Sequence, residues 1–303
     1  MKRTAVFDLD GTLETPYLGK DDVESVRKAV SGRFGADVFA KMYAETLGGM
    51  PHFFLNGALE LLKWVDSRGM DIVFFSNAIR PRNEELCPIL MARAFGGGKP
   101  PHFRLFSRPD CLDQNHGVPG FHRDDFDGLW GGGYKKKLAG VVVPEGDVGE
   151  TLMLEDDSSY ACMGEERNFI YGMYGGNANE FLANWSRGDK GWEKIVPFHL
   201  PFWFCGILSR TLKIADTEGL ALADAALRAM YGDDWPRFPA DGRYPEGKTW
   251  EERHNIPQPP QKDFSVFKEG LRELRAVNPS LCFWGDIDET SEDWPEWVRS
   301  RFW

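Results

Sequence analysis

Residues 4–13 read TAVFDLDGTL, a short apolar run that ends in two carboxylates one residue apart. An apolar run of this length predicts a buried strand of a parallel sheet, and open α/β sheets carry their chemistry in the loops that follow such strands. Asp8 and Asp10 are therefore expected at a strand end. Two acids there suggest a divalent-metal site in which one carboxylate also attacks a substrate, and the alternative is a solvated acidic turn.

Three later stretches favour the metal site. Residues 71–77 (DIVFFSN) predict another strand, which delivers the hydroxyl of Ser76 at its end. Residues 134–138 (YKKKL) supply cations that could neutralise a phosphoryl group, although a lysine run is more often a solvated helix face. Residues 151–158 (TLMLEDDS) repeat the opening pattern of a strand followed by clustered acids. Together the four signals indicate metal-dependent phosphoryl transfer.

The order and spacing of these stretches resemble the haloacid dehalogenase (HAD) superfamily of aspartate-nucleophile phosphotransferases. Its motifs are DxDxT, a strand-end Ser or Thr, a Lys, and a strand-end acidic pair. Residues 103–111 (FRLFSRPDC), 134–138 and 154–160 (LEDDSSY) further resemble the branch that contains the phosphatases of the RNA polymerase II tail and the NLI-interacting-factor-like proteins. The resemblance covers about residues 1–175.

This register selects Lys136 from the lysine run and Asp156 with Asp157 as the acidic pair. Neighbouring side chains of a helix point about 100° apart, so Lys136 alone among the three lysines is expected to reach the phosphate, with Lys135 and Lys137 facing away from the pocket.

The chain departs from the branch in two places. Gly11 stands where the branch usually has Glu, and the insertion at residues 111–133 is long and rich in Gly. Glu155 precedes the matched pair and is expected to have a structural role.

The resemblance implies a Mg²⁺-dependent phosphatase that works through an aspartyl phosphate. Asp8 would be the nucleophile, and Asp10 would protonate the leaving oxygen and then activate water. Mg²⁺ would be held by Asp8, the backbone carbonyl of Asp10, and Asp156 or Asp157. Substrate contacts are assigned to Ser76, Lys136, Thr12 and Asn77, of which Ser76 and Lys136 are also counted as catalytic.

The substrate class stays open between a phosphoprotein, a polynucleotide end and a small phosphoester. A phosphotransferase or a catalytically idle binding protein of the same fold is the alternative, but every matched catalytic position holds the residue type that the chemistry needs.

Composition predicts an intracellular, cytoplasmic protein. The chain has 303 residues, a net charge of −11, no apolar segment long enough to span a membrane, and five scattered cysteines, which indicate free thiols in a reducing compartment. The negative net charge does not indicate a nucleic-acid partner. A local basic rim around Arg80, Arg82 and Lys135–Lys137 could still hold a phosphorylated ligand.

The alternation of strands and helical patterns predicts an α/β, Rossmann-like, doubly wound parallel sheet with a small cap or none. Residues 1–190 are expected to form the HAD-like catalytic domain, and 191–303 a mainly helical C-terminal extension packed on it. The expected local elements are a crossover helix at 56–68, one or two short helices within 14–55, a last strand at 168–172, a helical stretch at 200–230 that breaks near 217–219, a proline-rich arm or loop at 234–262, and an amphipathic helix at 263–277.

Two further patterns are expected to be coincidental. Residues 284–290 (WGDIDET) also match DxDxT through Asp286, but no Ser, Lys or acidic-pair strand follows them. A second cluster could bind zinc and consists of Cys111, Asp113, His116 and His122. Its spacing does not fit common zinc motifs.

Overall fold

A computed structural model describes most of the region that carries the motifs. The described residues are 2–15, 20–113, 134–145, 147–156, 160–162, 165–171, 200–232, 264–281 and 290–293. Several sequence expectations lie outside them and stay predictions: those for Asp157, His116, His122, Asp286, most of the 111–133 insertion and the arm at 234–262.

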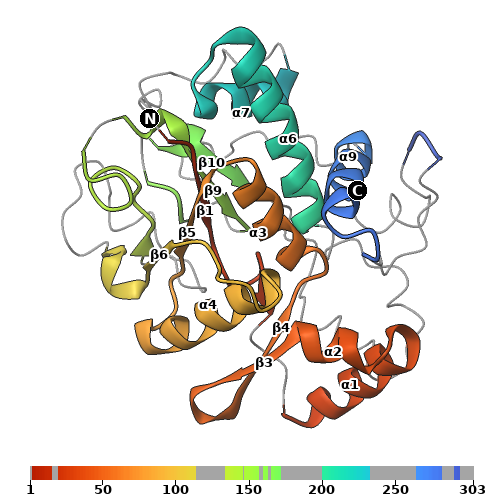
Figure 1. The fold of residues 1–303 in the computed structure, drawn as a ribbon. Coiled ribbons are helices and arrows are strands. Elements are labelled where there is room, and N and C mark those ends of the chain that lie inside the picture. Colours follow the sequence, from red (N-terminus) through yellow and green to blue (C-terminus); the bar gives the residue numbers. More distant parts are fainter. Residues whose placement is uncertain are drawn as a thin grey trace.

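A five-stranded parallel sheet forms the centre of the fold (Figure 1), as the sequence predicted. Its order is β10-β9-β1-β5-β6, with β1 (Thr4–Phe7) in the middle. The other strands are β5 (Asp71–Phe75), β6 (Phe103–Phe106), β9 (Thr151–Glu155) and β10 (Phe169–Tyr171). The chain runs from β1 to β5 and β6 on one side and returns to β9 and β10 on the other. The order of strands therefore reverses at β1, where open sheets of this kind place their ligands.

The two faces of the sheet are covered differently in the described residues. Ala5 and Phe7 belong to the main core, which also contains side chains of α3 (Ala58–Ser67) and α4 (Arg80–Ala94). Val6 points to the other face and packs in a smaller cluster with Leu138 and Val142. Because successive side chains of a strand alternate between faces, a strand buried on both faces reads as a continuous apolar run.

The region between β1 and α3 holds a second sheet that the sequence analysis missed. The predicted helices are present as α1 (Lys20–Phe34) and α2 (Ala36–Met42). With them lies an antiparallel sheet of order β2-β4-β3, made of β2 (Glu14–Thr15), β3 (Tyr43–Thr46) and β4 (Met50–Phe54). These strands are two to five residues long, too short to produce a clear alternation of apolar and polar residues.

The lysine run is not helical, so the geometric reason for expecting Lys136 alone to face the pocket was wrong. Tyr134–Lys135 form strand β8, which pairs with β7 (Leu112–Asp113), and Lys136 makes an isolated bridge to Ala161. Successive residues of an extended chain point to opposite sides, so Lys136 still points away from its neighbours. Short 3₁₀ turns occur at Leu47–Gly49, Arg108–Asp110, Val148–Glu150 and Glu166–Asn168.

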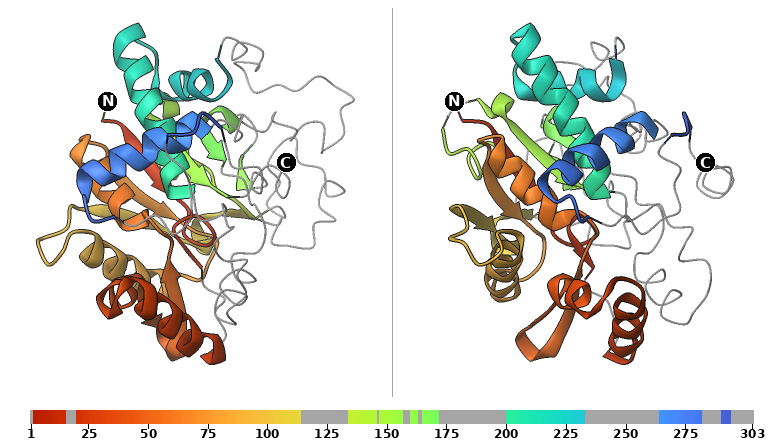
Figure 2. Two further views of the ribbon diagram at one scale, coloured as in Figure 1. Left: turned by 90° about the vertical axis from the view of Figure 1, so that its right-hand side faces the viewer. Right: turned by 45° about the vertical axis from the view of Figure 1, so that its right-hand side comes forward.

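The described C-terminal helices pack on the core, the first and the last of them against α3. They are α6 (Leu200–Glu218), α7 (Leu222–Tyr231) and α9 (Phe264–Val277), with the predicted break after residue 218. Figure 2 shows α6 and α9 crossing side by side, and their side chains belong to the main core. The Trp64 indole on α3 donates a hydrogen bond to Glu273 on α9 at 2.7 Å. In the part of the chain that is described, no helix has the length and apolar character needed to cross a bilayer.

Candidate active site

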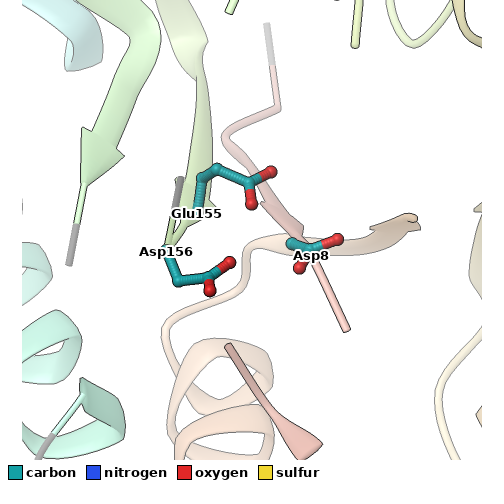
Figure 3. Close-up of side chains that lie close together, drawn as sticks. All are labelled: Asp8, Glu155 and Asp156. Carbon is teal, nitrogen blue, oxygen red and sulfur yellow. The ribbon is translucent and has the colours of Figure 1, made fainter. Parts of the chain in front are cut away.

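Asp8 lies where β1 ends, beside the end of β9. Its backbone N–H donates to the carbonyl of Leu154 at 3.0 Å, which continues the pairing of the two strands by one residue. Glu155 is the last residue of β9 and Asp156 follows it. One carboxylate oxygen from each of these three residues lies within 4.8 Å of the other two (Figure 3). Pairing of two adjacent parallel strands therefore creates the acidic cluster.

Lys136 enters this cluster from the segment after β8. Its ammonium donates to Oδ1 of Asp8 at 2.5 Å and to Oε2 of Glu155 at 2.6 Å. The Lys136 side chain is 1% exposed. Burial disfavours its charge, but the two carboxylates outweigh that effect and raise the pKa of Lys136. Lys136 thus stays charged among the acids.

The donor set of the cluster fits Mg²⁺. The ion prefers carboxylate oxygens, and Asp8, Glu155 and Asp156 each offer one. Burial raises the pKa of Asp8 and of Glu155, so crowding these acids is unfavourable without positive charge. Oε1 of Glu155 is buried and has no hydrogen-bond partner among the described residues, which leaves an acceptor for a cation. Glu155, expected to be structural, is therefore a candidate ligand.

The Asp10 carboxylate is bound by Arg82 and Ser76, outside the acidic cluster. Both terminal nitrogens of Arg82 donate to its carboxylate at 2.7 Å, and the Ser76 hydroxyl donates to Oδ2 at 3.0 Å. Burial alone would raise the pKa of Asp10, but Arg82 outweighs it and the pKa is lowered. Ser76 also accepts a hydrogen bond from the backbone N–H of Ala78 at 3.0 Å, so its hydroxyl is oriented.

Arg82 is the main site residue that sequence reasoning misplaced. It was assigned to an exposed basic rim, but its side chain is 6% exposed and points inward to Asp10 and Glu14. A basic residue in the first turn of α4 resembles an ordinary surface residue. Its carboxylate partners lie about 70 positions earlier in the chain, so local sequence contains no signal for the contact.

The remaining predicted residues surround the cluster. The buried Thr12 hydroxyl donates to Oδ1 of Asp156 at 3.4 Å, so Thr12 orients a candidate ligand, whereas the sequence analysis assigned it to substrate contact. The backbone carbonyl of Asn77 accepts a hydrogen bond from Nε of Arg108 at 2.8 Å. Gly11 has φ +81°, and a Cβ added there would lie 2.2 Å from Oδ2 of Asp156. In this arrangement the position favours Gly over the Glu usual in the resembled branch.

Comparison with known proteins found similarity at the level of structure. No protein-family model matches the sequence, and no curated protein does. The solved structure of Fcp1, an essential RNA polymerase II CTD phosphatase, aligns with a TM-score of 0.42 and 14% identity over 95% of each chain. A variant of fission yeast Fcp1 bound to beryllium fluoride aligns with a TM-score of 0.36 and 14% identity, over 78% of this chain and 63% of that one.

Proposed function

We propose that this protein is a Mg²⁺-dependent phosphatase that hydrolyses phosphomonoesters through a phosphoryl group carried on Asp8. The observation that carries the proposal is the cluster of the buried Asp8 and Glu155 with the half-buried Asp156, in which the ammonium of Lys136 is bonded to Asp8 and Glu155. A carboxylate nucleophile needs positive charge beside it to approach an anionic substrate. In this arrangement Asp8 supplies the carboxylate and Lys136 supplies positive charge.

Asp8 is assigned the attack on phosphorus. A bond forms between one of its carboxylate oxygens and phosphorus while the bond to the leaving oxygen breaks. Mg²⁺ held by Asp8, Asp156, the Asp10 carbonyl and Glu155 or Asp157 would offset the repulsion between the two anions. Lys136 lies against the attacking carboxylate and compensates charge on the phosphoryl oxygens.

Asp10 is assigned the proton transfers. Arg82 lowers the pKa of Asp10, so the proton that Asp10 gives to the leaving oxygen in the first half-reaction is first taken from the bound phosphomonoester monoanion. In the second half-reaction Asp10 takes a proton from the attacking water while the bond between Asp8 and phosphorus breaks, which restores Asp8 and releases phosphate. Ser76 reaches the Asp10 carboxylate and is placed to contact a phosphoryl oxygen beside it. Thr12 and Asn77 are assigned to holding the ligand shell and the substrate, respectively.

The substrate is a phosphorylated molecule: a phosphoprotein, a polynucleotide end or a small phosphoester. We place the protein in the cytoplasm, because the free thiols of Cys87, Cys111, Cys162 and Cys205 are typical of a reducing compartment. We further propose that 1–190 is the catalytic domain and 191–303 an extension docked on it. The bond between Trp64 and Glu273 supports the docking.

The test compares Asp8→Asn with the wild type on an aryl phosphate in the presence of Mg²⁺. Asn is nearly isosteric with Asp but a poor nucleophile, so activity should vanish while the circular dichroism spectrum is unchanged. Asp286→Asn is the control, because it alters the second DxDxT match and should be silent. An active Asp8→Asn variant would place the nucleophile elsewhere. A wild type that is inactive on aryl phosphate and phosphopeptides would favour a binding protein, and phosphoryl transfer to added glycerol in place of phosphate release would favour a phosphotransferase.

A further inference from the structure

A chain of buried polar side chains connects Asp10 with the second sheet. Arg82 bonds both Asp10 and Glu14, and Oε2 of Glu14 lies 3.0 Å from Nδ1 of His52. Nε2 of His52 lies 2.8 Å from the hydroxyl of Thr46. Glu14 and His52 are fully buried and Thr46 is 6% exposed. A polar chain of this length inside a protein is costly unless its members are paired. Each of these side chains has a partner, and Nε of Arg82 is the one buried nitrogen or oxygen of their side chains that has none among the described residues.

The Arg82 contact determines where the Asp10 carboxylate lies. Its two terminal nitrogens bond the two oxygens of Asp10 separately, each at 2.7 Å. A planar guanidinium that binds a carboxylate through two parallel hydrogen bonds restricts both its position and its rotation. The Ser76 hydroxyl adds a third bond to the same carboxylate.

The second sheet in turn holds Arg82. Glu14 comes from β2, His52 from β4 and Thr46 from β3, and the strands pair in the order β2-β4-β3. Each imidazole nitrogen of His52 has a partner, so the ring is fixed and directs the Glu14 carboxylate at Arg82. The guanidinium of Arg82 is thereby held by two carboxylates, that of Asp10 after β1 and that of Glu14 in the second sheet.

We propose that Arg82 is a positioning residue for Asp10, and that Glu14, His52 and Thr46 make the second sheet part of the catalytic apparatus. This inference rests on the proposed role of Asp10 in proton transfer. One carboxylate has to meet a leaving oxygen in one half-reaction and a water in the next, so a displacement of about 1 Å can cost about 10²-fold in rate. Arg82 acts through Asp10, so its loss should lower kcat and leave KM nearly unchanged.

The first experiment measures kcat and KM for Arg82→Ala and Arg82→Lys. We expect kcat to fall about 10²-fold in both, because a single ammonium nitrogen cannot make the two parallel bonds of the planar guanidinium to Asp10 while also reaching Glu14. Added guanidinium should restore part of the rate to Arg82→Ala. The control is Arg68→Ala, which loses an ion pair of the same 2.7 Å length, to Glu273, directly after the C-terminal end of α3 and away from the acidic cluster. A higher KM at unchanged kcat would make Arg82 a substrate-binding residue, and a loss without guanidinium rescue, or an equal loss in Arg68→Ala, would make its role merely structural.

A second experiment addresses the far end of the chain and does not require removal of the buried arginine. His52→Gln leaves the Arg82–Asp10 pair in place but cannot bond Glu14 and Thr46 with the geometry of a ring. We expect kcat to fall about tenfold, as for other outer partners of a site, with KM unchanged. Full activity in a folded His52→Gln protein would refute the part assigned to the second sheet.

A third measurement separates this inference from the proposed function. The melting temperatures of Arg82→Ala, Asp10→Asn and the double variant form a cycle that needs no activity. Coupling of the two residues shows as a double variant that loses less than the two single losses combined. Additive losses would refute the pairing on which the inference rests, whereas coupling in a protein without phosphatase activity would refute only the proposed function.

Discussion

Replacement of Gly11 by Ala tests the geometry of the acidic cluster at one atom. Gly11 has φ +81°, and the added Cβ would lie 2.2 Å from Oδ2 of Asp156, where ordinary contact begins at 3.4 Å. The Asp156 carboxylate therefore has to move by about 1 Å, because van der Waals repulsion rises steeply at shorter separations. That movement also disturbs the bond from Thr12.

Two costs are expected from this substitution, and a second glycine separates them. A non-Gly residue in the left-handed region costs about 1–2 kcal/mol. Gly97 has φ +82° and open space around its Cβ position, so Gly97→Ala carries the backbone cost alone. Gly11→Ala adds the displacement of a candidate ligand. Mg²⁺ demands near-ideal octahedral geometry, and a disturbed shell typically costs about 10–100-fold in affinity.

The assay is the Mg²⁺ concentration needed for half-maximal activity, together with the rise in melting temperature that Mg²⁺ produces. We expect Gly11→Ala to need about 10–100-fold more Mg²⁺ and Gly97→Ala to match the wild type. Urea unfolding without metal should give a similar loss of stability in both variants. Unchanged Mg²⁺ dependence in folded Gly11→Ala would refute the placement of Asp156 in the metal shell.

Three further predictions follow from the same structure. Lys136→Ala should lower the rate by about 10²–10³-fold, as does the loss of one hydrogen-bond donor to a developing negative charge, and Lys137→Ala should change the rate little. The reverse result in steady-state assays would show that the motif alignment that selects Lys136 is wrong. Chelation should abolish activity and Mg²⁺ should restore it with a higher melting temperature, whereas restoration by zinc alone would contradict the Mg²⁺ assignment. Gly270→Ala should destabilise the protein by about 1–3 kcal/mol in urea unfolding, because the added Cβ would lie 1.7 Å from the backbone carbonyl oxygen of Phe202. Its control is Gly32→Ala in α1, where the added Cβ meets nothing within 4 Å and should stabilise the helix by up to about 1 kcal/mol.

Elements with a strong local pattern could be predicted from the sequence. The strands at 4–7, 71–75 and 151–155 are almost entirely buried, so each appears in the sequence as a continuous apolar run. Helix α9 places Phe264, Phe267, Leu271 and Leu274 in the core at helical spacing, which the sequence displays directly. The locations of Asp8 and Asp156 follow from the same patterns, because each comes directly after a predicted strand.

The partners of the acidic residues depended on the tertiary structure. Strand order places the ends of β1 and β9 side by side, and this adjacency brings Glu155 into the cluster and Lys136 between two acids. The short strands of the second sheet give weak local signals, yet they bring Glu14 and His52 to Arg82. By itself the sequence determined which segments are strands and which acids follow them. Which charges meet was decided only by folding, because ion pairs between residues dozens of positions apart depend on strand order and leave no periodic trace in the chain.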